Sequence, residues 1–194
     1  MALSLLGILG SPRRGGNAEC LLDEALKGAA SSGALVEKVV LADRNIHPCR
    51  GCGDCDATGI CTFLDDMPPL LDKLRTVDRL VLASPVYFLS VTAQTKTMID
   101  RCQAQWAAKY LLKRPIPRHS SPQRRGLFLS AAGWKSPAVF QCAVRVVRAF
   151  FVTLDFRYDG DLLYNGMDEK GDILKHPLAL KEAFEAGARL ATAE

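Results

Sequence analysis

Short, nearly continuous apolar runs alternate along the chain with longer stretches in which apolar residues recur every three or four positions. The first run, residues 2–9, is predicted to be a strand, and residues 17–32, closed by Gly33, are predicted to be an amphipathic helix. Further strands are predicted at 35–41, 78–84, 125–131 and 154–158, and further helices at 67–76, 91–108, 136–151 and 178–191. Alternating strands and helices of this length predict an α/β fold with a parallel sheet covered on both faces.

Two stretches interrupt this alternation and bear on domain organisation. One is residues 44–66, which contain a cluster of cysteines, and the other is residues 112–124, which are rich in Pro, Ser and Arg. Neither half of the chain has enough apolar sequence for a core of its own, so we interpret both stretches as insertions in a single domain, residues 1–194. In a parallel sheet, ligands bind beyond the carboxyl ends of the strands, so the loops at those ends are the candidate site.

Composition limits the classes of function. A hydrophobic content of 48% suits one buried core, and a net charge of +4 without a basic arm or polybasic tract predicts no nucleic-acid or membrane partner. No apolar run approaches the roughly 18 residues of a membrane helix, and the N-terminus reads as a strand rather than a signal peptide. Seven cysteines, four of them within residues 49–61, favour metal or redox chemistry in a reducing compartment, so we expect a cytoplasmic protein.

The loop after the first strand, "GSPRRGGNAE", has the composition of an anion site. Its glycines allow close approach of the backbone, Ser11 and Arg13 can donate hydrogen bonds, and the helix that follows presents unpaired amides. The loop lacks the lysine of a P-loop and the spacing of a dinucleotide motif. The residues alone leave a second interpretation equally open, in which Gly15 and Gly16 only turn the chain and Asn17 caps the helix.

This loop resembles the "GSPRxxGNT" loop that binds the phosphate of FMN in the NADPH-dependent FMN reductase family. The segment "ASPVYFLSVTAQTKTMIDR" is similar to that family's second flavin loop and helix, "SAAGW" occupies the place of the third, and the C-terminal "DEKGDILKHPLALKEAFEAGARLA" is like the family's last helix. The cofactor-binding residues that the resemblance implies are Ser11, Arg13, Gly15, Gly16, Asn17 and Ala18 in the first loop, Pro85, Val86, Tyr87 and Phe88 in the second, and Ser130, Ala131, Gly133 and Trp134 in the third.

The resemblance implies a flavodoxin-like, doubly wound, five-stranded sheet of order 2-1-3-4-5 that binds FMN. Residues 85–88 would border the isoalloxazine and the ribityl chain. Ala18 stands where the family usually has Thr, which removes one hydroxyl donor to the phosphate, and the third loop is poorer in glycine than is usual. We assign no catalytic side chain, because a flavin carries its own chemistry and the protein has only to position it.

Cys49, Cys52, Cys55 and Cys61 form the run C-x2-C-x2-C-x5-C, whose ligand count matches a [4Fe–4S] cluster. The run resembles that of the iron–sulfur flavoproteins, a branch of the same reductase superfamily. Zinc, a redox-active dithiol and a cluster-free loop remain open alternatives. The other three cysteines fall in predicted helices, where we expect buried, apolar thiols; they are Cys20, Cys102 and Cys142.

The leading hypothesis is therefore an FMN-dependent oxidoreductase in which electrons pass between a [4Fe–4S] cluster, FMN and a small-molecule acceptor. The donor is a ferredoxin-type protein or NAD(P)H, which would bind only transiently against the flavin. A cluster-free NAD(P)H-dependent FMN or quinone reductase and an electron carrier without its own substrate are the alternatives. The family resemblance also implies a homodimer or homotetramer in which the cysteine loop of one subunit approaches the flavin of another.

Overall fold

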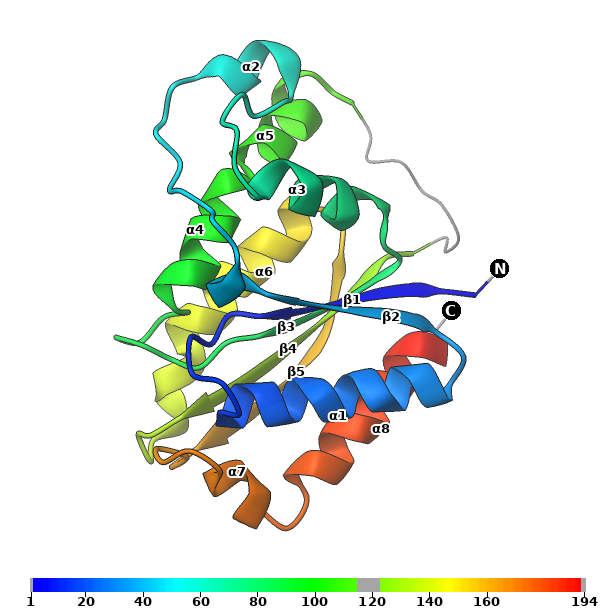
Figure 1. Cartoon of the computed structure of the whole chain (residues 1–194), viewed down its shortest axis with the longest axis vertical. Coiled ribbons are helices and arrows are strands. Elements are labelled where there is room, and N and C mark those ends of the chain that lie inside the picture. The colour runs from blue at the N-terminus through cyan, green and yellow to red at the C-terminus, as the bar shows by residue number, and fades with distance from the viewer. Residues whose placement is uncertain (1, 115–122, 193–194) are drawn as a thin grey trace.

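A five-stranded sheet forms the centre of the structure (Figure 1). The computed structural model describes residues 2–114 and 123–192. Within them the strands are β1 (Ser4–Leu9), β2 (Leu35–Val40), β3 (Arg79–Ala83), β4 (Arg125–Ala132) and β5 (Arg157–Asn165). Neighbouring strands are parallel and lie in the order β2-β1-β3-β4-β5. The predicted α/β fold, a doubly wound sheet of the flavodoxin-like order 2-1-3-4-5, is confirmed.

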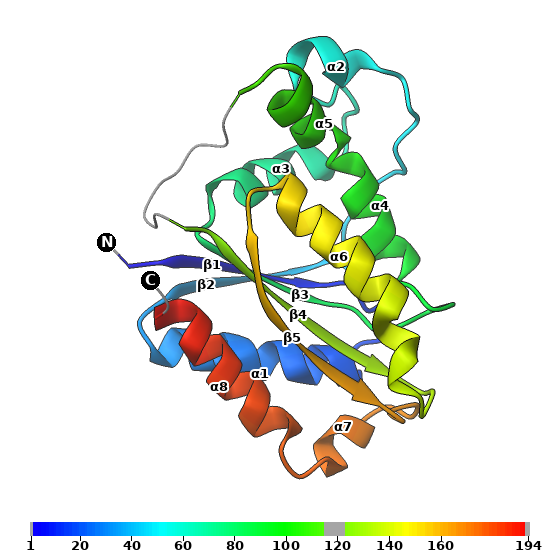
Figure 2. The same ribbon diagram turned by 180° about the vertical axis from the view of Figure 1, so that it is seen from behind.

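Helices cover both faces of the sheet (Figures 1 and 2). On one face lie α1 (Asn17–Ser31), α7 (Asp172–Lys175) and α8 (Ala179–Thr192). On the other lie α3 (Met67–Thr76), α4 (Ala93–Arg101) and α6 (Gln141–Thr153). The shorter elements are η1 (Leu41–Asp43), α2 (Asp54–Thr58), α5 (Gln103–Trp106), the π-helical turn η2 (Ala107–Leu111) and η3 (Pro137–Phe140).

The hydrophobic core has two layers, one on each face of the sheet, because successive side chains of a strand alternate between the faces. In β1, Leu5 and Leu9 pack in the layer formed with α1 and α8, whereas Leu6 and Ile8 pack in the layer formed with α3, α4 and α6. Successive side chains of a strand point to opposite faces, so a strand buried on both faces needs apolar residues at nearly every position. This explains why the central strands appear in the sequence as continuous apolar runs.

The fifth strand lies later in the chain than predicted. Leu154 and Phe156 suggested a strand at 154–158, but they are buried at the end of α6 and in the turn that follows it. The observed β5 begins at Arg157 and is mostly half-buried, with a register shift against β4 between Gly126 and Leu127. As an edge strand, β5 is stabilised by pairing with β4 and does not need the continuous apolar run by which buried strands are found.

Two smaller expectations also differ from the structure. The helix predicted over 91–108 is divided into α4, α5 and η2, with the change of geometry at Cys102. Cys102 is buried and Cys20 is half-buried, but Cys142 is exposed, so the expectation of a buried thiol was wrong there. Cys142 lies one position before Ala143, at which the buried face of α6 begins.

Glycines bring α1 and α8 into direct backbone contact. A Cβ atom on Gly28 would clash with the carbonyl oxygen of Phe184, and one on Gly187 would clash with the carbonyl oxygen of Ala25. Helix propensity alone favours alanine over glycine by about 1 kcal/mol. The clash is with backbone atoms of the facing helix, which cannot rotate away. We therefore expect its energetic cost to exceed the gain in helix propensity.

We therefore expect Gly187→Ala to lower the free energy of unfolding, by about 1–3 kcal/mol, because the two helices must separate to admit the methyl group. Denaturant unfolding of the variant and the wild type measures the difference. Gly28→Ala should act in the same direction, since its added methyl group meets the backbone of the same pair of helices. An increase in stability for either variant would show that propensity, and not close packing, governs this contact.

The loops of interest meet at one edge of the sheet. Residues 10–16, 84–92 and 133–136 follow β1, β3 and β4, whose parallel carboxyl ends lie side by side. The cysteine-rich stretch 44–66 follows β2 and η1, as predicted, whereas the second interruption, 112–124, lies mostly outside the described residues. Among the helices that the structure describes, none has the length and apolar character to cross a membrane.

Candidate functional site

A cavity with a volume of about 100 Å³ lies where the three loops meet at the carboxyl edge of the sheet. Each loop contributes to its wall, and the segment that follows β5 closes one side with Met167 and Asp168. The volume is below the roughly 300–1,000 Å³ that small-molecule pockets commonly have. A ligand held here would therefore extend beyond the cavity and across the neighbouring surface.

The first loop presents the N-terminus of α1 to this cavity. The residue at the N-cap position is Gly16, which has no side chain to occupy the free amides of the first helical turn. Gly15 adopts a left-handed conformation with φ of 62°, and its amide donates to the Glu19 carboxylate at 2.6 Å. The amides and the positive end of α1 thus remain available to an anion.

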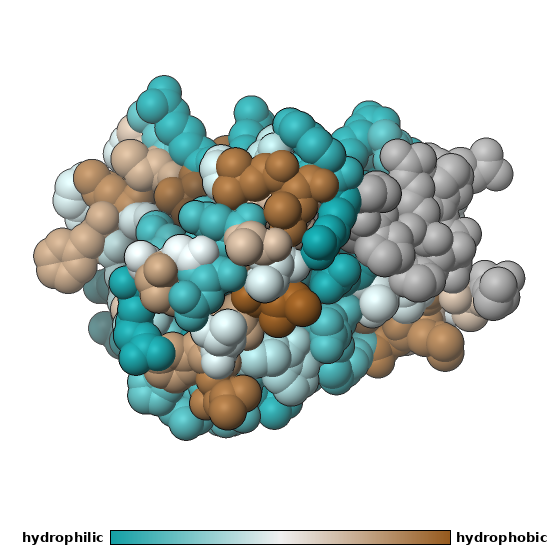
Figure 3. All heavy atoms as spheres, turned by 90° about the horizontal axis from the view of Figure 1, so that it is seen from above, coloured by the Kyte–Doolittle hydropathy of each residue, from teal (hydrophilic) through white to brown (hydrophobic). Residues whose placement is uncertain are grey.

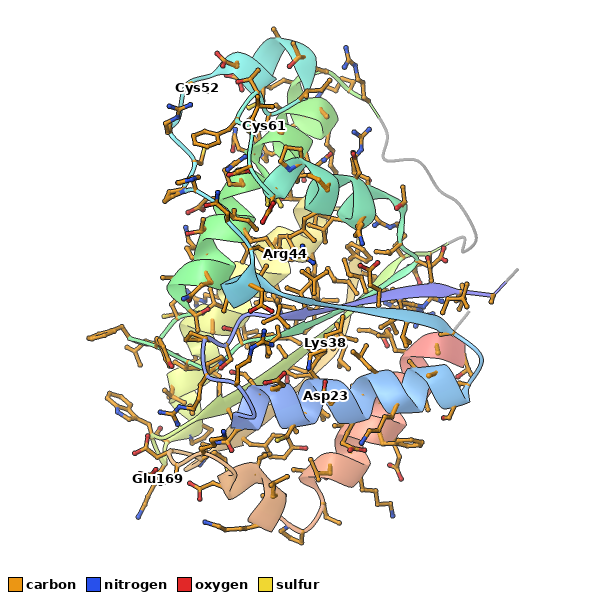
Figure 4. The ribbon with its side chains drawn as sticks, in the orientation of Figure 1. Asp23, Lys38, Arg44, Cys52, Cys61 and Glu169 are labelled. Carbon is orange, nitrogen blue, oxygen red and sulfur yellow. The ribbon has the colours of Figure 1, made fainter. Side chains whose placement is uncertain are left out.

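A network of ion pairs joins β2 to the first two turns of α1. Lys38 of β2 donates to Glu19 at 2.8 Å and to Asp23 at 2.6 Å, and Figure 4 shows Lys38 beside Asp23. Burial alone would raise the pKa of the Glu19 carboxyl, but the hydrogen bonds from Lys38 and from the Gly15 amide hold that pKa below its usual range. Glu19 is therefore ionised at neutral pH and fixes the backbone of the loop.

Asn17 joins the first loop to the segment after β5. Its Nδ2 donates to the carbonyl oxygens of Met167, at 3.3 Å, and Glu169, at 2.9 Å. Its Oδ1 accepts from the amides of Gly171, at 3.0 Å, and Ile173, at 3.2 Å. An asparagine amide has two donor hydrogens and two acceptor sites, so all four are used within the protein. The side chain therefore neither caps α1 nor remains free for a ligand, and only its backbone amide can face one.

Two cations lie over the first loop. Arg13 lines the cavity, and its Nη1 donates to the carbonyl oxygen of Asp168 at 3.3 Å. Lys170, from the segment after β5, reaches the same loop, because a Cβ atom placed on Gly15 would lie 3.2 Å from its Nζ. Arg13 and Lys170 therefore add positive charge beside the free amides of α1.

The second loop forms a hairpin at the rim of the cavity. Tyr87 and Ser90 exchange backbone hydrogen bonds of 2.9 and 3.1 Å, and the two residues between them, Phe88 and Leu89, have φ of 49° and 63°. Left-handed conformations at both central positions match a tight hairpin turn, which usually requires Asn or Gly. The turn leaves the Phe88 side chain fully exposed, while Pro85, Val86 and Tyr87 line the cavity.

The third loop closely approaches the segment after β5 at Gly133. A Cβ atom on Gly133 would lie 2.5 Å from Oδ1 of Asp168. Ser130, before the loop, is buried and donates from Oγ to the Ser84 carbonyl oxygen at 2.7 Å, so it joins β4 to the second loop instead of lining the cavity. The Trp134 side chain is mostly exposed and does not line the cavity either.

The four cysteines of the insertion line a second cavity, of about 440 Å³. Gly51, Gly53 and Gly59 have positive φ, which lets the chain turn tightly between the cysteines. The loop packs on α5 and η2, where Gly59 contacts Ala108 of η2. Arg114, which follows η2, donates from Nη1 to the Thr58 carbonyl oxygen at 2.7 Å. Cys52 and Cys61 lie at the end of the molecule distant from Glu169 (Figure 4).

A buried ion pair lies beside this second cavity, and its cation, Arg101, is part of the cavity lining. Arg101, the last residue of α4, donates from Nη1 to Asp65 at 2.5 Å and from Nη2 to the Cys61 sulfur at 3.4 Å. Burial would raise the pKa of the Asp65 carboxyl, but hydrogen bonds from Arg101 and from the amides of His47 and Met67 hold that pKa below its usual range. The network joins residues on both sides of the cysteine run.

The sequence profile of one family, "NADPH-dependent FMN reductase", matches residues 3–153. The chain belongs to this family. Among curated relatives, an "Iron-sulfur flavoprotein" of Archaeoglobus fulgidus is 52% identical over 51% of this chain and 45% of its own length. "Iron-sulfur flavoprotein MJ1083" of Methanocaldococcus jannaschii is 42% identical over 51% of this chain and 51% of its own. The predicted resemblance to the reductase family and its iron–sulfur flavoproteins is confirmed.

The matched part of the chain spans about half the length of these two relatives. Among solved structures, a "flavone reductase" superposes with a TM-score of 0.73 at 21% identity, covering 98% of this chain and 62% of that one. "NAD(P)H:quinone oxidoreductase from Methanothermobacter marburgensis" superposes with a TM-score of 0.73 at 14% identity, covering 98% of this chain and 100% of that one. At these identities the structures show a shared fold.

The structure brings together most of the residues predicted to bind the cofactor of this reductase family. The predicted residues that line the first cavity are Ser11, Arg13, Gly16, Asn17, Ala18, Pro85, Val86, Tyr87, Ala131 and Gly133. Those that do not line it are Gly15, Phe88, Ser130 and Trp134, and lining residues that the sequence analysis missed are Ala132, Met167 and Asp168. Met167 and Asp168 follow β5, which was predicted too early in the chain. The apolar pattern therefore gave no indication that these two residues lie at the cavity.

The contact between Gly133 and Asp168 gives a prediction for the apo protein. We expect Gly133→Ala to lower the free energy of unfolding by about 1 kcal/mol, since the new methyl group must displace the carboxylate. In an Asp168→Ser background the same substitution should cost less, and the difference is the coupling energy of a double-mutant cycle. Equal costs in both backgrounds, measured by denaturant unfolding, would show that Asp168 does not restrict this position.

Proposed function

We propose that the chain, taken as one flavodoxin-like domain, binds FMN at the carboxyl edge of the sheet and acts as an FMN-dependent oxidoreductase. The observation that carries the proposal is the first cavity, in which the free N-terminus of α1 and the Arg13 side chain lie beside two further loops. Helix N-termini bind phosphate through unpaired amides and the helix dipole. Membership of the reductase family supports FMN as the ligand.

Each loop has a separate task in this proposal. The amides of Asn17 and Ala18, with Arg13 and Ser11, would bind the FMN phosphate, and Lys170, which lies outside the predicted loops, would add positive charge. Residues 85–87 and 131–133 would flank the ribityl chain and the isoalloxazine. Bound FMN supplies hydride acceptance and release of electrons singly or in pairs, so the chain has only to hold and orient it.

We further propose that Cys49, Cys52, Cys55 and Cys61 hold a [4Fe–4S] cluster. All four cysteines line the 440 Å³ cavity. Arg101 also lines it, and its buried Nε has no hydrogen-bond partner within the described residues. Over the same residues, no three histidine, cysteine or acidic side chains converge closely enough to bind one metal ion. The thiols of Cys49 and Cys52 are exposed, so they can turn inward to complete the ligand set. The cluster would exchange single electrons.

We propose that two or more copies of the chain complete the redox unit. No described residue lines both cavities. Figure 4 shows Cys52 and Cys61 far from Glu169, which lies in the segment that follows β5 beside the first cavity. The first cavity is too small to enclose FMN, and apolar residues beside both sites face solvent, among them Phe88, Leu64 and Ile60. Figure 3 shows such apolar side chains among polar ones at the end that carries α2. A partner's cysteine loop could cover the exposed flavin.

Sedimentation of the FMN-loaded protein tests this assembly. We expect a dimer or tetramer in the wild type, and a shift toward monomer in Phe88→Ser, which removes the largest fully exposed ring from the hairpin beside the flavin site. Such a residue stabilises an interface when a partner buries it. A monomeric wild type that holds both cofactors would contradict the shared site.

Anaerobic reduction of the bound flavin distinguishes the candidate electron donors. We propose that a ferredoxin-type protein or NAD(P)H supplies electrons and that a small molecule such as a quinone, oxygen or peroxide receives them, in a cytoplasmic setting that keeps the thiols reduced. Bleaching of the bound flavin by reduced ferredoxin, with slow bleaching by NAD(P)H, supports the cluster as the entry point. Rapid bleaching by NAD(P)H in iron-free protein would instead support a cluster-free FMN or quinone reductase.

A further inference from the structure

We propose that Arg101 tunes the reduction potential of the iron–sulfur centre by donating hydrogen bonds to the Cys61 sulfur and, through Nε, to the cluster. The inference rests on the proposed function, because it requires the cluster to be present. Arg101 would act on the cluster without ligating it, as a positioning and tuning residue.

The first support is the incomplete hydrogen bonding of a buried side chain. The Arg101 side chain is 1% exposed. Its Nη1 and Nη2 donate to Asp65, to the His47 carbonyl oxygen and to the Cys61 sulfur, but its Nε has no partner within the described residues. A buried donor left unpaired costs about 1–3 kcal/mol, so such a group in a native fold calls for a partner. Arg101 lines the cysteine cavity, where a cluster would offer acceptor sulfur atoms.

The second support is the rigidity of the guanidinium. Asp65, whose side chain is fully buried, accepts two hydrogen bonds from Arg101, and it also accepts from the amides of His47 and Met67. The Arg101 Cζ atom also lies over the Phe63 ring, 4.9 Å from the ring centroid. The cation therefore cannot swing away from the thiol run, and its charge acts in surroundings of low dielectric constant.

The direction of the effect follows from charge. Reduction transfers one electron to the cluster, from the flavin or an external donor, and adds one unit of negative charge without transfer of an atom. A fixed cation and N–H···S hydrogen bonds stabilise this more negative state, and such hydrogen bonds are among the determinants of cluster potential. Arg101 should therefore make the cluster easier to reduce.

Redox titration of the FMN- and iron-loaded protein, followed by EPR of the reduced cluster, measures this effect. We expect Arg101→Gln to lower the equilibrium constant for one-electron reduction about tenfold, equivalent to about 59 mV. Arg101→Lys keeps the charge but loses the planar set of guanidinium N–H donors, so it should lower the potential by less than Arg101→Gln does. The control Arg189→Gln removes an exposed cation on α8, on the opposite face of the sheet, and should leave the potential unchanged.

A second measurement starts from the wild-type protein. In wild-type protein labelled with ¹⁵N in the arginine side chains, pulsed EPR should detect a weak nitrogen coupling from Arg101 to the reduced cluster. Arg101→Lys should remove this coupling, whereas any coupling from Arg50, which also lines the cavity, should remain. An iron-loaded Arg101→Gln protein with the wild-type potential, or a wild type without this coupling, would overturn the role of Arg101 and leave the cluster proposal intact. A wild type that binds FMN but no iron would overturn both.

Discussion

Cys52→Ser should abolish iron binding and leave FMN bound at the wild-type affinity. Cys52 lies in the exposed loop that lines the 440 Å³ cavity, whereas the residues proposed to bind FMN line a different cavity. A hydroxyl is a poor ligand for iron in a cluster that is held by thiolates. Iron and sulfide assays and flavin fluorescence on the anaerobically purified variant measure the two outcomes separately.

Cys142→Ser provides the matched control for this experiment. Cys142 is also exposed, but it lies on α6, outside the cysteine loop, so its replacement should change neither iron nor FMN content. Equal loss of iron and FMN in Cys52→Ser would show that the loop supports the fold of the flavin site. Full retention of iron would remove Cys52 from the ligand set.

Arg13→Ala should weaken FMN binding about 10- to 100-fold. Arg13 lines the cavity beside the N-terminus of α1, and loss of a hydrogen bond to a charged group costs about 1.5–3 kcal/mol. The effect should be confined to ligands that carry the phosphate, so the affinity for riboflavin should change little. Titration of the apo protein with FMN and with riboflavin, followed by fluorescence, gives both dissociation constants.

The adjacent Arg14 serves as the control for Arg13. Arg14 carries the same charge, but it pairs with Asp43 and Glu19 and does not line the cavity. Arg14→Ala should therefore leave FMN affinity within about threefold of the wild type, because a screened surface charge contributes little. Equal losses for the two variants would show that net charge, and not a contact to the phosphate, determines the affinity.

The parts of the site that the sequence predicted are those encoded by residues adjacent in the chain. The loop from Ser11 to Ala18 and the cysteine run from 49 to 61 each carry their donors within a few positions, so composition and spacing were informative. Buried strands such as β3 were equally clear, because burial on both faces imposes a continuous apolar run.

Residues brought to the site by tertiary packing could not be predicted in the same way. Asp168 and Lys170 reach the first loop only because the segment after β5 folds back and is tied to Asn17. Arg101 falls in a helix of ordinary amphipathic pattern, and its contact with Cys61 depends on how the insertion packs against α4. Phe88 was expected at the flavin, and its exposure follows from the left-handed hairpin turn, which its residue type disfavours.

Anaerobic purification, followed by assays of FMN, iron, sulfide and zinc per chain, tests the central claim most directly. We expect about one FMN together with about four irons and matching sulfide, and no zinc. Flavin without iron or sulfide would contradict the cluster and leave a plain FMN reductase. Iron without flavin would contradict the assignment of the first cavity.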